Sequence, residues 1–546
     1  MPNAWNAGQQ TAAAYAPAVG WYRKDFLLPS SAPSDSWIVR FESVNNSATI
    51  WLNGHRLGSH TGAFLAFELP LPAGDLNRGA LNRLVLRVSD AHTLSDLPPL
   101  SRSGPGGVVG GWWNYGGLLR EVYLRRVQGL DISSVQVLPK LPCAACAAEI
   151  SYTVVVHNYA ASALAVALRA SYGALATELG RQTVAPGADA TFRGSVRVAA
   201  PQLWSPASPH LYDVTIVAAG PAGSGAGARY ELQSGIRSVT VSGGRMYLNG
   251  QPLHLRGVGL VEDSPSAGSA LSAPAQLALM MKAKQLGATI VRSQYPLSAY
   301  EEQLADELGI LLWSEIPVYQ VHDGELGAVT PAALALLREN ILENGNHPSI
   351  AIWSIANELD PIVDPAQSAY IAAAVRAARA LDPTRPVALA YQGYPGIPCQ
   401  AGYSPLGLLG INDYFGWYPG PGGEIADPSL LASYLAHERA CYPHQAIMIS
   451  EFGAEANRSG PVDEPGTYQF QSQFIASQLA SIAAAPWLSG AIYWALQDFL
   501  VRPGWSGGNP YPTPPLFTKG LLDFAGAPKP AWSVVQQSYT ATRQVG

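Results

Sequence analysis

The first 240 residues alternate apolar and polar positions in short runs, the two-residue period of strands with one buried face. Asn53-Gly54 follows one of these runs and is a strong signal for a hairpin turn. The runs are Trp21–Phe26, Ser36–Phe41, Ala48–Leu52, Arg83–Val88, Ile150–Val156, Leu164–Arg169 and Leu211–Val217. They predict two β-sandwiches, a jelly-roll-like one over residues 1–128 and an immunoglobulin-like one over residues 129–240.

From about residue 253 the pattern changes, because short continuous apolar runs now alternate with segments of helical period. The predicted strands are Leu253–Gly259, Thr289–Arg292, Ile310–Trp313, Ile350–Ser354, Pro386–Ala390, Leu408–Asn412, Ala446–Ser450 and Gly490–Trp494. Predicted helices between them include Pro274–Gln285, Pro331–Leu342, Ala366–Leu381 and Thr467–Ala484. This alternation predicts a (β/α)8 TIM barrel over residues 241–546.

Two glutamates stand where strands of this barrel are predicted to end. Glu358 closes the string Ala351-Ile-Trp-Ser-Ile-Ala-Asn-Glu358, and Glu451 lies in Ile447-Met-Ile-Ser-Glu-Phe-Gly453. The active site of such a barrel is built at the carboxyl ends of its strands, so both side chains are expected at one mouth. Glycoside hydrolysis needs two such carboxyl groups, one to protonate the leaving oxygen and one to attack or to activate water. The alternative is that both are ordinary glutamates of exposed loops.

Three further side chains are predicted at the same mouth. Arg292 ends the second predicted strand, Tyr414 follows the sixth and Trp494 closes the eighth. Arg292 suits an ion pair with Glu451, a contact with substrate or a purely structural ion pair. Trp494 suits either a floor for the apolar face of a sugar or plain core packing.

Composition narrows the class of protein. The chain has 546 residues, of which 48% are hydrophobic and 13% charged, which is typical of a globular protein of several domains. The formal charge is −6 and no cluster of Lys and Arg is present, so we expect neither a nucleic acid nor a membrane as partner. No apolar run reaches the roughly 18 residues of a membrane span. No signal peptide is apparent, which leaves a cytoplasmic protein and a trimmed secreted protein both open.

The cysteines decide little. Cys143 and Cys146 form a single CxxC with no second pair and no nearby His, so a local disulfide or free thiols are favoured over a metal site. No other set of His, Cys and carboxylate residues has the spacing of metal ligands. We therefore expect no metal and no other cofactor.

Strings along nearly the whole chain resemble glycoside hydrolase family two, the β-galactosidases, β-glucuronidases and β-mannosidases. In the first predicted sandwich they are Trp51-Leu-Asn-Gly-His-Arg-Leu-Gly58, Gly62-Ala-Phe-Leu-Ala-Phe67 and Asn114-Tyr-Gly-Gly-Leu-Leu-Arg120. In the barrel they are Leu248-Asn-Gly-Gln-Pro-Leu-His-Leu-Arg-Gly257, Asn346-His-Pro-Ser-Ile350, Trp353-Ser-Ile-Ala-Asn-Glu358 and Ser450-Glu-Phe-Gly453.

The resemblance implies roles for several residues. Glu358 would be the general acid/base and Glu451 the nucleophile of a retaining reaction. Asn357 resembles the residue that binds the sugar 2-hydroxyl, with a strand-end turn as its alternative role. Tyr414 resembles the tyrosine that donates a hydrogen bond to the nucleophile, with core packing as its alternative role.

The chain also departs from the family pattern. Arg292-Ser-Gln294-Tyr-Pro296 has Gln294 where relatives commonly carry a histidine, and glutamine can still bind a hydroxyl. The family's His-Glu-Asp appears as Val261-Glu262-Asp263, which leaves Asp263 a candidate hydroxyl contact and argues against a metal-assisted site.

The expected function is that of a retaining exo-β-glycosidase acting on a β-glycoside or an oligosaccharide end. As expected substrates, β-glucuronides and β-galactosides rank nearly equally, and β-mannosides rank third. β-Glucuronidases of the family bind the substrate carboxylate with an Asn-x-Lys motif, and the stretch that resembles it here, Gly507–Tyr511, contains no lysine. Arg502 is a candidate replacement, with a solvated loop arginine as its alternative role. The alternative class is a non-catalytic carbohydrate-binding protein. Whether the chain forms a homo-oligomer stays open.

Overall fold

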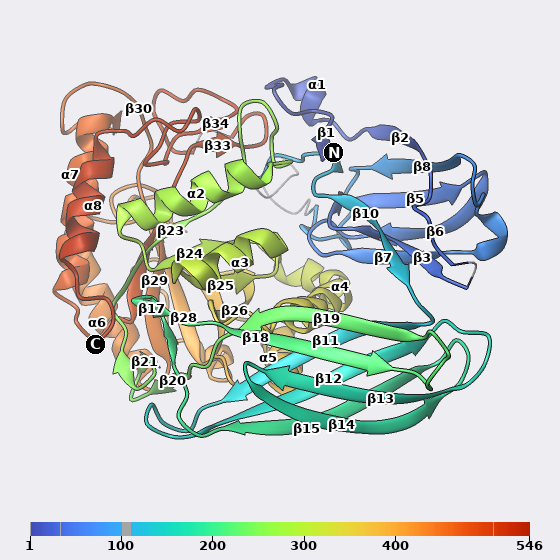
Figure 1. Ribbon diagram of the computed structural model, residues 1–546. Helices are drawn as coiled ribbons and strands as arrows, with labels where there is room; N and C mark the ends of the chain where they lie inside the picture. The colour runs from blue at the N-terminus through green and yellow to red at the C-terminus, as the bar shows by residue number, and fades with distance from the viewer. Residues whose placement is uncertain (1, 33, 101–110, 421, 506) are drawn as a thin grey trace.

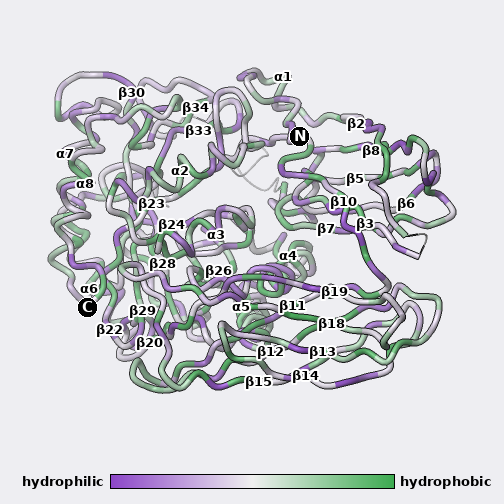
Figure 2. The backbone as a smooth tube through the Cα atoms, in the orientation of Figure 1, coloured by the Kyte–Doolittle hydropathy of each residue, from purple (hydrophilic) through white to green (hydrophobic). Residues whose placement is uncertain are grey.

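The computed structural model describes residues 2–32, 34–100, 111–420, 422–505 and 507–546. Two β-sandwiches lie beside a barrel, and the first of them stands next to the barrel mouth (Figure 1). Along the strands of both sandwiches, hydrophobic and hydrophilic residues alternate, which is the pattern seen in the sequence (Figure 2).

The first sandwich packs one four-stranded sheet against shorter ones. The four-stranded sheet has the order β2 (Val19–Phe26), β8 (Asn82–Ser89), β5 (Ser47–Leu52) and β6 (His55–Thr61). The other sheets are β10 (Val122–Val127), β3 (Ser36–Phe41) and β7 (Phe67–Leu71), and β1 (Asn3–Ala4), β9 (Gly117–Leu118) and β4 (Val44–Asn45). Asn53 and Gly54 join β5 to β6 with φ of 52° and 93°, which confirms the predicted hairpin turn.

The second sandwich consists of longer strands around a core that includes Tyr152, Leu168 and Phe192. Its first sheet has the order β11 (Leu130–Lys140), β12 (Ala148–Asn158) and β15 (Asp189–Val198). Its second has the order β14 (Leu175–Val184), β13 (Leu164–Tyr172), β18 (Tyr212–Ala219) and β19 (Gly227–Ser234). Arg237 fixes this sandwich to the barrel, because its guanidinium donates to the carbonyl oxygens of Pro348 (3.0 Å) and Ile350 (2.7 Å).

The barrel is a closed ring of eight parallel strands, and all eight predicted strands are present. In order they are β23 (Leu255–Gly259), β24 (Ile290–Ser293), β25 (Leu311–Glu315), β26 (Ile350–Asn357), β27 (Val387–Gly393), β28 (Leu408–Asp413), β29 (Ala446–Phe452) and β32 (Gly490–Tyr493). The largest differences from the predicted ends are the three extra residues at the carboxyl ends of β26 and β27.

Helices surround most of the ring. They are α2 (Ala273–Leu286), α3 (Ala299–Leu308), α4 (Asp323–Asn344), α5 (Pro365–Leu381), α6 (Leu431–Cys441), α7 (Tyr468–Ala483) and α8 (Ala531–Ala541). Only the 3-10 turn η2 (Ala401–Tyr403) separates β27 from β28. The predicted start of α4 at Pro331 was wrong, because the helix begins eight residues earlier and Pro331 lies inside it. The proline ring faces the carbonyl four residues back, which here belongs to Gly327.

Two disulfides join the four cysteines, Cys143 to Cys146 and Cys399 to Cys441. The first selects one of the two states that the sequence left open, and the second was not foreseen. In the described ranges, the one group of side chains spaced to hold a metal is Cys399, His437 and Cys441, whose two sulfurs form that second disulfide. No helix in these ranges is both long and apolar enough to cross a membrane.

Candidate active site

A cavity of about 400 Å³ opens at the carboxyl ends of the barrel strands. Glu358 and Glu451 both line it, Glu358 directly after β26 and Glu451 near the end of β29. The first sandwich closes one side with Asn45, Phe64, Trp112, Trp113, Tyr115 and Arg120. The cavity is therefore built by two domains, and the barrel alone supplies only part of its wall.

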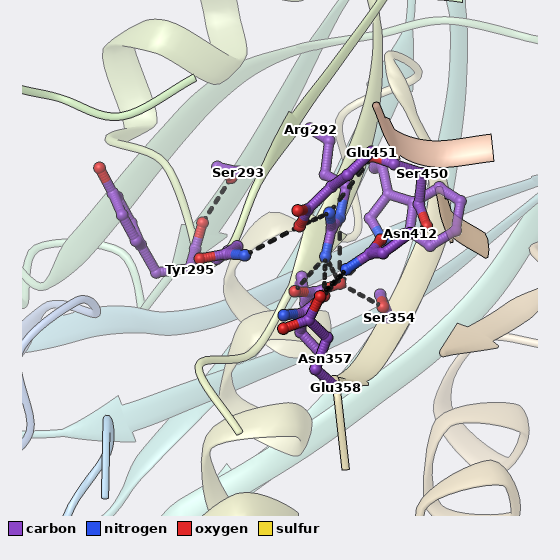
Figure 3. Close-up of polar contacts among 12 residues, drawn as sticks. Arg292, Ser293, Tyr295, Ser354, Asn357, Glu358, Asn412, Ser450 and Glu451 are labelled. Carbon is purple, nitrogen blue, oxygen red and sulfur yellow. Dashed lines mark hydrogen bonds and ion pairs between the residues drawn. The ribbon is translucent and has the colours of Figure 1, made fainter. Parts of the chain in front are cut away.

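Arg292 lies between Glu451 and Asn357 (Figure 3) and is 0% exposed. Its Nη1 donates to Glu451 Oε1 at 2.7 Å, and its Nη2 donates to Asn357 Oδ1 at 2.7 Å and to Glu315 Oε1 at 3.0 Å. Of the three alternatives from the sequence, the structure selects the ion pair with Glu451 and adds a second partner, Glu315. One guanidinium thus holds a carboxylate on each side, and it also orients the amide beside Glu358.

Glu451 is held by three donors. Besides Arg292, the phenol of Tyr414 donates to Oε2 at 2.6 Å and the amide of Gln294 donates to Oε1 at 3.1 Å. Tyr414 therefore makes the contact that the resemblance implies. Gln294, expected at a substrate hydroxyl, is instead directed at the carboxylate of Glu451.

The donors to Glu358 among the described residues are neutral. The amide of Asn412 donates to Oε1 at 2.8 Å, and the amide of Gln320 donates to Oε2 at 3.0 Å. Burial raises the pKa of the Glu358 carboxyl above its ordinary value, and the nearby charge of Glu451 raises it further. The two glutamates thus differ in environment, since one faces a guanidinium and the other faces amides.

The remaining candidates lie around the cavity. Trp494 lines it directly after β32, and Asp263 lines the side toward the first sandwich. Asp263 accepts hydrogen bonds from the hydroxyl of Tyr115 (2.7 Å) and from the backbone N–H of Leu500 (2.8 Å), and burial raises its pKa to about 7. Arg502 is not among the described residues that line the cavity. Its guanidinium lies 5.5 Å from the ring centre of Trp505, which does line the cavity.

Lys519 and Glu315 are charged residues that the sequence analysis did not identify, and Lys519 lies beside the cavity. It is 0% exposed, and its Nζ lies 3.7 Å and 3.8 Å from the ring centres of Tyr414 and Tyr418, both of which line the cavity. Nζ makes no hydrogen bond with any described residue. Burial lowers the pKa of Lys519 to about 7, against the opposing effect of Glu455, Glu451 and Glu358.

Comparisons with known proteins agree with this architecture. Three family descriptions match in order: "Glycosyl hydrolases family 2, sugar binding domain" over residues 7–127, "Glycosyl hydrolases family 2" over 130–237, and "Glycosyl hydrolases family 2, TIM barrel domain" over 239–499. Among curated relatives, a β-glucuronidase of Paenibacillus borealis is 27% identical over 89% of this chain and 82% of its own length. A β-glucuronidase of Mus musculus is 26% identical over 88% and 76%.

Solved structures show the same fold. A β-galacturonidase from Eisenbergiella tayi bound to galacturonate superimposes with a TM-score of 0.87 at 23% identity, covering 100% of this chain and 93% of that one. A Bifidobacterium dentium β-glucuronidase in complex with coumarin-3-O-glucuronide superimposes with a TM-score of 0.84 at 24% identity, covering 100% and 92%.

The buried position of Arg292 predicts a large cost for removing it. Arg292→Gln leaves Glu315 and Glu451 without their cation, so the free energy of unfolding should fall by about 3–5 kcal/mol. Arg169→Gln is the matched control, because Arg169 pairs with Glu178 at 2.7 Å on the surface and its loss should cost less than about 1 kcal/mol. Denaturant unfolding of both variants measures the difference. Equal losses would contradict the account of the site.

Proposed function

The chain belongs to glycosyl hydrolases family 2 and is a glycoside hydrolase, and from this premise we propose that it cleaves terminal β-glycosides with retention of configuration. Glu451 is the nucleophile and Glu358 the general acid/base. The single observation that carries the proposal is the contrast between two carboxyl groups on one cavity, one bound by Arg292 and one surrounded by amides. A double displacement requires this division of roles.

In the first step Glu451 attacks the anomeric carbon while the bond from that carbon to the leaving oxygen breaks. Attack needs a carboxylate held in a fixed direction, and the contacts from Arg292, Tyr414 and Gln294 hold Glu451 in place. The proton of Glu358 passes to the leaving oxygen, and the raised pKa of Glu358 favours the protonated form that this step needs.

In the second step Glu358 takes a proton from a water molecule, whose oxygen attacks the anomeric carbon and releases Glu451. The incoming water leaves its oxygen on the sugar, and Glu358 regains the proton that it lost.

Asn357 is placed to position the sugar. Its Oδ1 accepts from Arg292 (2.7 Å) and from Asn412 (2.9 Å), which turns its Nδ2 away from both donors. Nδ2 has no partner among the described residues, so it is available to a hydroxyl beside the anomeric carbon. Trp494 offers a ring at the same mouth, and Asp263 offers a carboxyl at the junction with the first sandwich.

A uronide is the sugar class that Lys519 supports. A buried ammonium without a hydrogen bond is costly, and a carboxylate reaching it past Tyr418 would satisfy it with a charge-assisted bond. The names of the relatives, β-glucuronidase and β-galacturonidase, agree with this choice. In this proposal Lys519, and not Arg502, binds the substrate carboxylate.

The nucleophile is tested by trapping. A 2-fluoro glycoside with an activated leaving group should label Glu451, because the fluorine slows both steps while the leaving group keeps the first step fast. Peptide mapping should locate the label. Glu451→Gln should lower kcat by several orders of magnitude because no covalent intermediate can form. A label on another residue would overturn the assignment.

The acid/base is tested by the dependence of rate on the leaving group. Glu358→Ala should damage substrates with poor leaving groups far more than activated aryl glycosides, which need little protonation. Azide should restore turnover of the activated substrates, since a small anion can replace water without a general base. Equal losses across leaving groups, with no rescue, would refute this role.

The uronide preference is tested with Lys519→Met. Loss of the charge should lower kcat/KM for a β-uronide by about 30- to 1,000-fold, or about 2–4 kcal/mol, and leave a neutral β-galactoside nearly unchanged. Arg502→Ala is the control and should leave kcat/KM unchanged for both the β-uronide and the β-galactoside. Because Lys519 has a pKa of about 7, it is charged below that pH, so the wild-type KM for the uronide should rise above pH 7. A wild-type enzyme that ignores uronides would contradict the proposal.

A further inference from the structure

The outer face of the four-stranded sheet in the first sandwich carries a pair of stacked tryptophans. Trp21 on β2 and Trp51 on β5 have ring centres 5.8 Å apart and planes inclined by 24°. Trp21 is 64% exposed. Large aromatic surface left in water on a folded domain marks a place where a ligand or another molecule binds.

Strand alternation explains why these rings face outward. On the inner face Ile50, Leu84 and Leu86 are buried in the core of the sandwich. Trp21 lies opposite Arg87 on β8 and Trp51 lies opposite Val85, so both tryptophans stand on the other face. The core does not require the two rings, and in Figure 1 the three strands lie side by side in the first sandwich, at a distance from the barrel.

Arginines surround the pair. Arg23 and Arg83 both bind Asp25, at 2.6 Å and 2.8 Å, while Arg56 lies opposite Trp51 on β6. No hydrogen bond or ion pair joins the side chain of Arg87 to another described residue, and Arg87 is exposed. Four arginines against one aspartate give this face a net charge of +3 on a chain whose formal charge is −6.

We propose that this face, defined by Trp21, Trp51, Arg23, Arg56, Arg83 and Arg87, binds a glycan chain that carries uronate carboxylates. Indole rings pack on the apolar faces of sugar rings, and guanidinium groups pair with carboxylates in a planar, two-bond geometry. The positive face on a negative chain selects an acidic polymer over a neutral one. None of these residues lines the catalytic cavity, so the inference goes beyond hydrolysis and concerns how a polymer is held near the enzyme.

Affinity electrophoresis of the full chain tests the proposal. Wild-type protein should be retarded in native gels that contain polygalacturonate and should run freely in gels that contain a neutral galactan. Trp21→Ala combined with Trp51→Ala should weaken binding by about ten-fold or more, and Arg87→Gln alone should weaken it measurably. Salt should reduce the retardation, because the arginines are exposed.

Matched controls come from the second sandwich. Tyr230→Ala removes another exposed aromatic ring, and Arg181→Gln removes another exposed arginine, and both should bind like wild type. Hydrolysis of a small aryl β-glycoside should be unchanged in every variant, which shows that each is folded. Arg87→Gln keeps the test decisive if the double tryptophan variant fails to fold.

Three results would overturn the proposal. Equal retardation by the neutral galactan would exclude selection by charge. Face variants that are retarded like wild type would exclude the face. A wild-type dimer in light scattering that becomes a monomer in the tryptophan variant would identify the face as a contact between copies of this chain.

Discussion

One buried guanidinium sets the geometry on which the catalytic site depends. Arg292 is surrounded by the carboxylates of Glu315 and Glu451 and by the amide oxygen of Asn357, and it lies 5.7 Å and 5.9 Å from the ring centres of Trp313 and Trp494. A charge in such a place is tolerated only when its partners are fixed. Because those partners come from the third, fourth and seventh barrel strands, satisfying Arg292 also fixes the positions of the residues assigned to catalysis.

The first sandwich completes what the barrel begins. Arg120 donates to the carbonyl of Phe64 at 2.7 Å within its own domain and to Glu262 at 3.1 Å on the barrel. Tyr115 donates to Asp263 across the same junction. These contacts are buried, so separating the two domains would expose partnered charges and open the cavity on one side. The cavity is therefore complete only when the first sandwich is docked on the barrel.

Local patterns were sufficient for the fold and for the two glutamates. Most barrel strands contain a short apolar run, and the strings around Glu358 and Glu451 are unusual enough to point to strand ends. Local sequence patterns do not predict contacts between side chains on different barrel strands. The sequence does not show that Gln294 turns toward Glu451, that Glu315 shares Arg292, or that Lys519 lies behind Tyr414, because these pairs are brought together only when the ring closes. Lys519 lies eight residues after Tyr511, outside the stretch that resembles the β-glucuronidase motif, so the sequence pattern did not identify it.

In the proposed mechanism two carboxyl groups carry out a double displacement, and the stereochemistry of the product tests this. Proton NMR of an aryl β-uronide during the first minutes of hydrolysis reports the anomer of the sugar before mutarotation mixes the two forms. A double displacement predicts that the β-anomer appears first and that the α-anomer forms later by mutarotation. An α-anomer that appears first would mean a single displacement by water, and it would contradict the assignment of Glu451 as nucleophile.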